Sequence, residues 1–90
     1  MNLKFKKGDG FVLSINEAKE QFARKQRNLV REVVDMEMTY CINRGMRFGS
    51  IVVDYMDELL EEELKEKGYN VEQYSIFGLK MNKWRISFEF

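Results

Sequence analysis

The chain has 90 residues, of which 44% are hydrophobic and 33% are charged, and its 15 basic side chains balance 15 acidic ones. This length suits a single domain over residues 1–90, and the apolar fraction suffices for a packed core, which argues against disorder. No apolar run reaches the ~20 residues that a membrane span needs, and a single cysteine excludes an internal disulfide, so we expect a cytoplasmic protein with no membrane partner.

A short hairpin is predicted at the N-terminus, over residues 1–13. Leu3 and Phe5 alternate with lysines, and residues 8–10 read Gly-Asp-Gly, which is typical of a turn. The apolar pattern resumes at residues 11–13. We therefore expect two short antiparallel strands before the first helix.

A long helix is predicted over residues 15–44. Ser14 and Glu17 match a capping box, in which the serine hydroxyl and the glutamate carboxylate each accept a hydrogen bond from the other residue's backbone N–H. No proline interrupts the segment, and Gly45 follows Arg44 as a C-cap. At a rise of ~1.5 Å per residue this helix would run ~45 Å, which is long for so small a domain.

Two adjacent apolar stripes follow this first helix. One contains Phe22, Leu29, Val33, Met36 and Tyr40, and the other contains Ala23, Val30, Val34 and Cys41. So wide a face exceeds what one short helix and a small hairpin can cover. We therefore expect self-association through the first helix, as a two-fold homodimer.

A second helix is predicted from Ser50, as its N-cap, to Lys67, with Gly68 as the stop. Its apolar residues recur at helical spacing, and they are Val52, Tyr55, Met56, Leu59, Leu60 and Leu64. Residues 45–50 then form a short connector. Two amphipathic helices joined in this way pack as an antiparallel hairpin.

Beyond Gly68 the apolar pattern changes from a helical period to strict alternation, over residues 69–77 and again over 84–90. The segment Gly78–Lys83 supplies the turn, so a C-terminal β-hairpin is expected. The predicted fold class is α+β. It combines a long antiparallel helical hairpin with N-terminal and C-terminal β-hairpins that form one small antiparallel sheet.

The C-terminal third carries a resemblance. A helix exit reading Leu64-Lys65-Glu66-Lys67-Gly68-Tyr69-Asn70-Val71, followed by a strand reading Trp84-Arg85-Ile86-Ser87-Phe88, resembles small bacteriophage and prophage proteins that share an L-x-x-x-G-Y-x-V exit and a final W-x-I-S-W/F strand. These motifs are structural. The resemblance implies a phage-encoded accessory protein that acts in a bacterial host cytoplasm or in the virion, and it transfers no functional residue.

The sequence offers no catalytic constellation. Histidine is absent, which removes the commonest general base and metal ligand. Cys41 is the only candidate nucleophile, and its place on an apolar stripe favours a buried packing thiol. A phosphate-binding glycine loop is also missing. We therefore predict a non-enzymatic protein with no catalytic residue, cofactor or metal.

Charge is segregated along the chain. Residues 1–31 carry eight basic and three acidic side chains, whereas residues 32–66 carry ten acidic and three basic ones. A surface of one sign attracts a partner of the other sign, and that partner is either a separate molecule or another part of the same chain. Folding the second helix back would bring Glu63 and Glu66 beside Arg27 and Arg31.

Two surfaces are predicted to bind a partner protein. The first is the acidic edge of the second helix, and its residues are Asp54, Asp57, Glu58, Glu61 and Glu62. The second is the connector, with Arg44, Arg47 and Phe48. Two other roles are open to the acidic edge. It would imitate the phosphates of a nucleic acid and so occupy a DNA-binding enzyme, or it would contribute ligands to a divalent-cation site.

The resulting hypothesis is a homodimeric binding module of phage type, whose partner is a host or viral protein that it inhibits. One alternative is a nucleic-acid-binding regulator that contacts phosphates through the basic face of the first helix, with Arg24, Lys25, Arg27 and Arg31. Another alternative is a structural component of a virion.

Overall fold

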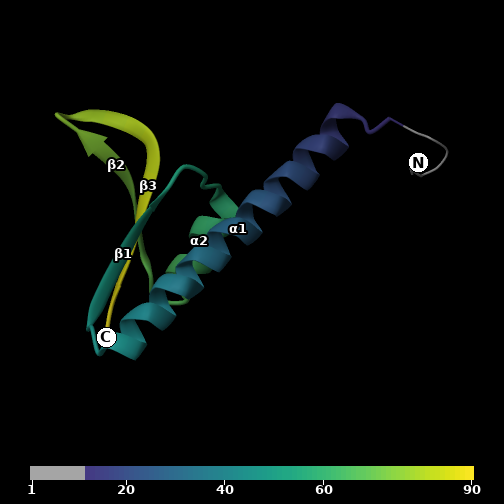
Figure 1. Cartoon of the computed structure of the whole chain (residues 1–90). Helices are drawn as coiled ribbons and strands as arrows, with labels where there is room; N and C mark the ends of the chain where they lie inside the picture. The colour runs from purple at the N-terminus through teal and green to yellow at the C-terminus, as the bar shows by residue number, and fades with distance from the viewer. Residues whose placement is uncertain (1–11) are drawn as a thin grey trace.

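The structure is a computed structural model that describes residues 12–90. Along the chain it contains α1 (Ile15–Arg44), β1 (Phe48–Val53), α2 (Glu58–Glu66), β2 (Asn70–Ile76) and β3 (Leu79–Glu89) (Figure 1). The α+β class is confirmed. Of the predicted N-terminal hairpin, residues 12–13 belong to no strand and the rest lies outside the described residues.

Helix α1 begins and ends where its sequence predicts. The Glu17 N–H donates to the Ser14 hydroxyl over 3.1 Å, and the Ser14 N–H donates to the Glu17 carboxylate over 3.0 Å, which completes the capping box. At the other end Gly45 adopts a left-handed conformation with φ of 69°, and the Met46 N–H donates to the Cys41 carbonyl over 2.8 Å. This end matches a C-terminal glycine cap.

The segment after α1 corrects the sequence prediction. Residues 48–53 form strand β1, so the predicted connector over 45–50 and the predicted second helix from Ser50 are both wrong there. The physical reason is the run Ile51-Val52-Val53, because β-branched side chains fit a pleated strand better than a helix. Within β1 the buried Gly49 and the half-buried Ile51 and Val53 alternate with exposed residues.

Helix α2 is therefore shorter than predicted, and its N-cap is Asp57. The Asp57 carboxylate accepts a hydrogen bond from the Leu60 N–H over 2.9 Å. The end of the helix agrees with prediction: Lys67 is the C-cap, Gly68 has φ of 96°, and the Tyr69 N–H donates to the Leu64 carbonyl. Glycine suits this position because it lacks the Cβ that disfavours positive φ.

The sheet has the strand order β1-β3-β2, and both pairings are antiparallel. The predicted C-terminal hairpin is present as β2 and β3, although β3 begins at Leu79 and takes up most of the predicted turn. Strands β1 and β2 run in the same direction on either side of β3, and α2 connects them. This is a split β-α-β arrangement, preceded by the long helix.

The two helices run in the same direction, whereas an antiparallel hairpin was predicted (Figure 1). Arg27 of α1 contacts Asp57 at the start of α2, and Arg31, one turn further along α1, contacts Glu63 near the end of α2. The cause is β1, which returns the chain along α1 before α2 begins.

The core lies between the two helices and one face of the sheet. Its buried residues are Val30, Val34, Leu60, Leu64 and Ile86, and the partly buried residues around them are Ile51, Val53, Tyr55, Met56, Tyr69 and Val71. Ile51, Ile86 and Val71 lie opposite one another across the three strands. Neither helix of the described chain is long and apolar enough to cross a membrane.

Candidate interaction surfaces

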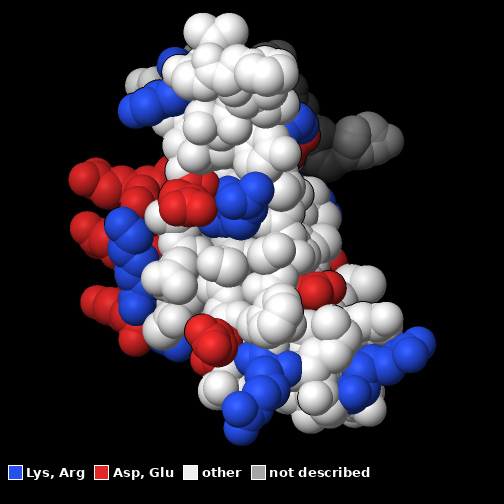
Figure 2. Space-filling view, turned by 90° about the vertical axis from the view of Figure 1, so that its left-hand side faces the viewer, with Lys and Arg blue, Asp and Glu red and all other residues white. Residues whose placement is uncertain are grey.

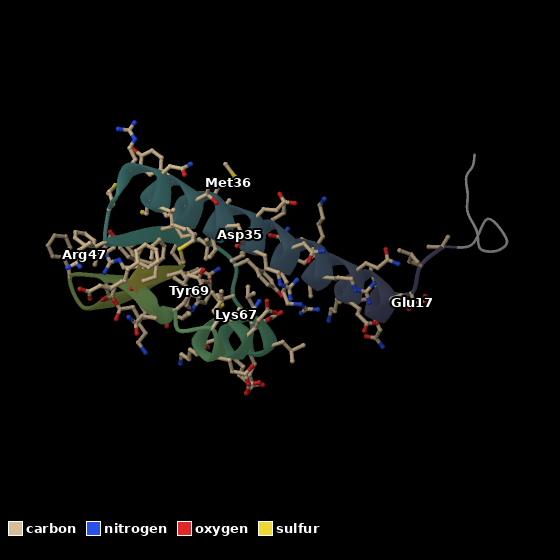
Figure 3. All side chains as sticks on the ribbon, turned by 90° about the horizontal axis from the view of Figure 1, so that it is seen from below. Glu17, Asp35, Met36, Arg47, Lys67 and Tyr69 are labelled. Carbon is tan, nitrogen blue, oxygen red and sulfur yellow. The ribbon has the colours of Figure 1, made fainter. Side chains whose placement is uncertain are left out.

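The two apolar stripes of α1 have different environments. Val30, Val34 and Cys41 of one stripe are buried against the sheet and α2. The other stripe is exposed, and the side chains of Phe22 and Met36 are 60% and 69% accessible. Met36 projects from α1 on the side away from α2 and the sheet (Figure 3). An apolar row of this length on a helix is typical of an interface.

A groove of about 440 Å³ runs between this exposed stripe and β1. It is lined by Gln26, Leu29, Val30, Val33, residues 51–54 and Lys83. Among the described strands β1 is an edge strand, so one side of its backbone has no strand partner within residues 12–90. The groove therefore joins an apolar helix face to an open sheet edge.

Asp57 links α1 to α2 through a cluster of hydrogen bonds. Its Oδ2 accepts from Arg27 Nη1 over 2.6 Å and from the Tyr55 hydroxyl over 2.7 Å, while Oδ1 caps α2 through Leu60. Burial opposes ionisation of Asp57, but the bonds from Tyr55, Leu60 and Arg27 prevail and hold the pKa of its carboxyl below the ordinary value. Burial and the bond to Asp57 raise the pKa of Tyr55.

Arg31 and Glu63 form a second link between the helices, as the charge pattern predicts. Arg31 donates from Nε over 2.9 Å and from Nη2 over 2.6 Å to the two carboxylate oxygens. The hydrogen bond from Arg31 lowers the pKa of Glu63 and, reciprocally, raises the pKa of Arg31. Glu66 was also predicted to lie beside these arginines, but Arg31 pairs with Glu63 and Arg27 pairs with Asp57.

The structure divides the predicted acidic edge into structural and exposed residues. Asp57 belongs to the link just described, and Glu61 pairs with Lys65 over 2.7 Å on the same helix. Asp54, Glu58 and Glu62 remain exposed. Figure 2 shows acidic side chains gathered along one side of the molecule, at the left of the view. The exposed part of the edge is a solvated acidic face.

The predicted basic face of α1 is divided in the same way. Arg24 and Lys25 are exposed, whereas Arg27 and Arg31 are committed to Asp57 and Glu63. An arginine that pairs with a partly buried carboxylate would have to give up that bond before it bound a phosphate. The fold therefore brings together less basic surface than the sequence indicates.

The predicted connector residues lie at the end of α1 and the start of β1. Arg44 stacks on the Tyr40 ring with its guanidinium carbon 5.1 Å from the ring centroid. Arg47 is exposed, and the side chain of Phe48 is 66% accessible. Phe90, also exposed, lies at the same end, since its N–H donates to the Arg47 carbonyl over 2.7 Å. Exposed arginine and aromatic side chains together are typical of protein-binding surfaces.

The tip of the β2–β3 hairpin is an exposed apolar surface that sequence reasoning missed, because these residues read as a strand end and a turn. The Phe77 side chain is 98% accessible, and Ile76, Leu79 and Met81 beside it are also exposed. Phe77 has φ of 54°, a left-handed conformation that is unusual for an aromatic residue. Figure 2 shows the end of this hairpin, at the top of the view, as mostly uncharged.

Cys41 is a packing thiol in this structure. It is fully buried, and its Sγ lies 3.6 Å from a Glu37 carboxylate oxygen and 3.6 Å from the Phe48 carbonyl oxygen. Burial, followed by the charge of Glu37, raises the pKa of the thiol and so disfavours the reactive thiolate. Within residues 12–90 no three acidic or cysteine side chains converge to form a metal-binding group.

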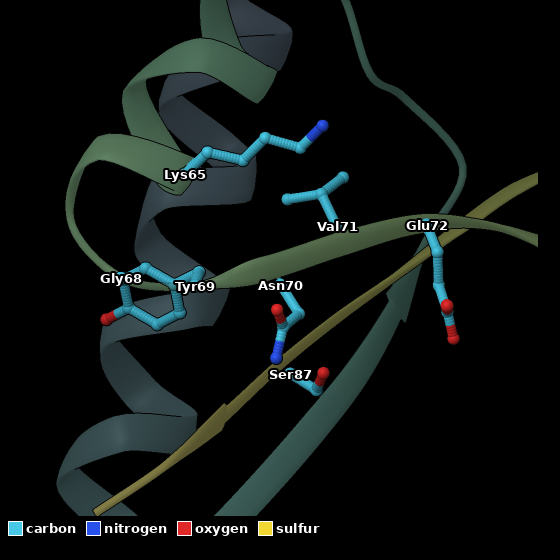
Figure 4. Close-up of a pocket in the computed structure, with 7 residues that line it drawn as sticks. All are labelled: Lys65, Gly68, Tyr69, Asn70, Val71, Glu72 and Ser87. Carbon is cyan, nitrogen blue, oxygen red and sulfur yellow. The ribbon is translucent and has the colours of Figure 1, made fainter.

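An open polar hollow lies at the β2 edge of the sheet, and a close-up shows it (Figure 4). Its lining residues are Lys65, Gly68, Tyr69, Asn70, Val71, Glu72 and Ser87. Asn70 and Ser87 are cross-strand neighbours. Tyr69 packs edge-on against Phe88, and burial raises its pKa, with a smaller effect from the charge of Asp35. The hollow is wide open and its lining mixes charged, polar and apolar residues, so its lining does not point to one class of ligand.

Comparison of the chain with protein-family models, with curated proteins and with solved structures finds no match. The chain's interaction surfaces must therefore be interpreted from their own geometry and chemistry.

Proposed function

We propose that this protein is a non-enzymatic binding module that acts as a homodimer and binds another protein. The exposed apolar stripe of α1 is the observation that carries the proposal. Phe22, Leu29, Val33, Met36 and Tyr40 are each at least 40% accessible. Exposure of this row to water is unfavourable at about 25 cal/mol per Å² of apolar surface, so association that covers it is favoured.

The exposed corner around Arg47 and Phe48 supports a second contact, with a different protein. It combines an arginine with aromatic side chains and lies at the opposite end of α1 from Phe22. A dimer joined along α1 would display this corner twice, which favours binding to a repeated or symmetric partner through avidity. A phage-encoded protein that binds and inhibits a host protein in the bacterial cytoplasm would fit these properties.

The dimer is tested by measuring mass in solution. Light scattering at micromolar concentration should give twice the chain mass for the wild type and the monomer mass for Phe22→Glu. Leu59→Glu on α2 is the matched control, because Leu59 is 65% accessible and lies off the stripe. A monomeric wild type, or equal effects of the two substitutions, would contradict the proposal.

The partner surface is tested by affinity capture from a bacterial lysate. The wild type should retain a specific protein that Arg47→Glu with Phe48→Ala loses, whereas Glu58→Lys with Glu62→Lys should retain it. If only the Glu58→Lys, Glu62→Lys variant loses the captured protein, the contact surface is the exposed acidic face of α2. A wild type that captures nothing would argue against a protein-binding role.

A further inference from the structure

The exposed stripe of α1 extends into a heptad pattern over most of the helix. Ile15, Phe22, Leu29 and Met36 recur every seven residues, and a second set of positions lies four residues after each of them. This second set is Lys19, Gln26, Val33 and Tyr40. We call the eight positions the α1 seam. Seven of them are exposed and Gln26 is half-buried. Six of the eight, all except Lys19 and Gln26, are apolar or aromatic. Apolar residues at a spacing of four and three are typical of helices that pair side by side.

We propose that the α1 seam pairs with the α1 seam of a second copy of this chain, in antiparallel orientation. The proposal rests on the homodimer proposed above and adds its geometry. The two-fold axis crosses the helices between Gln26 and Leu29. Phe22 then faces the partner's Val33, and Ile15 faces the partner's Tyr40.

The shape of the molecule favours this orientation. The first turns of α1 extend beyond the sheet and α2 (Figure 1), and residues 15–22 are exposed apart from the half-buried Ala18. In an antiparallel pair, the projecting turns of each copy lie against Met36 and Tyr40 of the other. The partner's residues 22–29 then follow the groove between α1 and β1. A parallel pair would place the two projecting ends against each other and away from both sheets.

The charges beside the seam favour the same orientation. Lys25 and Glu32 are exposed, are seven residues apart and lie on the same side of the seam. In the antiparallel pair Lys25 approaches the partner's Glu32, and the symmetry repeats this contact. In a parallel pair Lys25 and the partner's Glu32 would lie about two helical turns apart and would not meet. More broadly, the basic first half of α1 faces the partner's acidic second half.

Disulfide trapping tests the orientation. Chains with Phe22→Cys and chains with Val33→Cys are mixed and oxidised gently, and the native Cys41 stays in place because it is buried. The mixture should give the mixed disulfide, and each variant alone should give little product. Homodisulfides in the separate samples would indicate a parallel pair and overturn the inference while the dimer stands. A monomeric wild type would overturn the dimer itself.

Charge exchange tests the register. Glu32→Lys should raise the dimer dissociation constant about tenfold, because two attractive pairs become repulsive, and Lys25→Glu should do the same. The double variant should recover the wild-type constant to within about threefold, because each pair is restored with reversed signs. In a parallel pair Lys25 and the partner's Glu32 do not meet, so reversing both charges would not restore a lost contact. Failure of the double variant to recover the wild-type constant would therefore refute the antiparallel register.

Discussion

Arg31 and Glu63 join the middle of α1 to α2 in a two-point contact, with both carboxylate oxygens held by the guanidinium group at 2.6 and 2.9 Å. This planar geometry orients the two helices as well as attracting them. Both side chains remain partly accessible, so water weakens the attraction. The contact therefore serves the orientation of α2 more than the total stability.

Glu63→Gln should remove a pH-dependent part of the stability. The folded-state pKa of Glu63 is lowered from 4.5, so the stabilisation is present above the unfolded-state pKa and is lost as pH falls through the folded-state value. Urea unfolding at pH 7 should show a loss of about 0.5–1 kcal/mol, which should shrink as the pH is lowered through the folded-state pKa of Glu63. Glu62→Gln, on an exposed neighbour, should show no such trend.

Asp57→Ala should destabilise the fold by about 2 kcal/mol, because it removes the N-cap of α2 and leaves Arg27 and Tyr55 without their shared acceptor. Asp57→Asn keeps a capping oxygen and should cost less. Chemical unfolding monitored by circular dichroism measures both. Asp54→Ala, an exposed aspartate just before α2, is the matched control, and an equal cost there would refute the assignment.

Gly49→Ala should destabilise the packing of α1 on the sheet by about 1–3 kcal/mol. A Cβ at this position would lie 2.7 Å from Cys41 Sγ and 2.7 Å from Phe88 Cζ, so strand and helix would have to separate. Ser50→Ala, next along β1 and exposed, should have little effect. The midpoints of thermal unfolding compare the two, and unchanged stability of Gly49→Ala would show that the interface adapts.

Phe77→Asn should stabilise the hairpin by about 0.5–1 kcal/mol, because asparagine tolerates the positive φ and Asn-Gly is the favoured sequence for a turn in which both residues have positive φ. Phe77 has φ of 54° and Gly78 has φ of 79°. Leu79→Asn, which also removes an exposed apolar side chain, serves as the control and should not stabilise. A lower unfolding temperature for Phe77→Asn would show that the aromatic ring itself stabilises the tip.

Sequence patterns a few residues long correctly predicted the secondary-structure elements whose ends depend on capping residues and turns. The capping box at Ser14, the glycine at position 45 and the change of period after Gly68 each act over a few residues, so α1, the end of α2 and the C-terminal hairpin could be predicted. Strand β1 could not, because its apolar residues fit a helical spacing as well as an alternating one. Only the β-branched run Ile51-Val52-Val53 distinguished the two.

The candidate surfaces were predicted less completely, because their accessibility depends on tertiary packing. Asp57 and Arg27 are charged residues that the sequence presents as available, yet the direction of α2 brings them together. Conversely, the exposure of Phe77 follows from the position of the turn, which falls earlier than the alternation indicates. Of the two stripes on α1, the sequence could not say which would face the sheet.

The position of β3 has a consequence for synthesis of the protein. This strand lies between β1 and β2 but follows both of them along the chain. Neither β1 nor β2 can form sheet hydrogen bonds with its neighbour until β3 has left the ribosome, although α1 and α2 can form earlier. Both earlier strands thus remain open to wrong pairing with other nascent chains until translation of the sheet is finished. The sheet then forms in one late step, which depends on contacts between distant parts of the sequence.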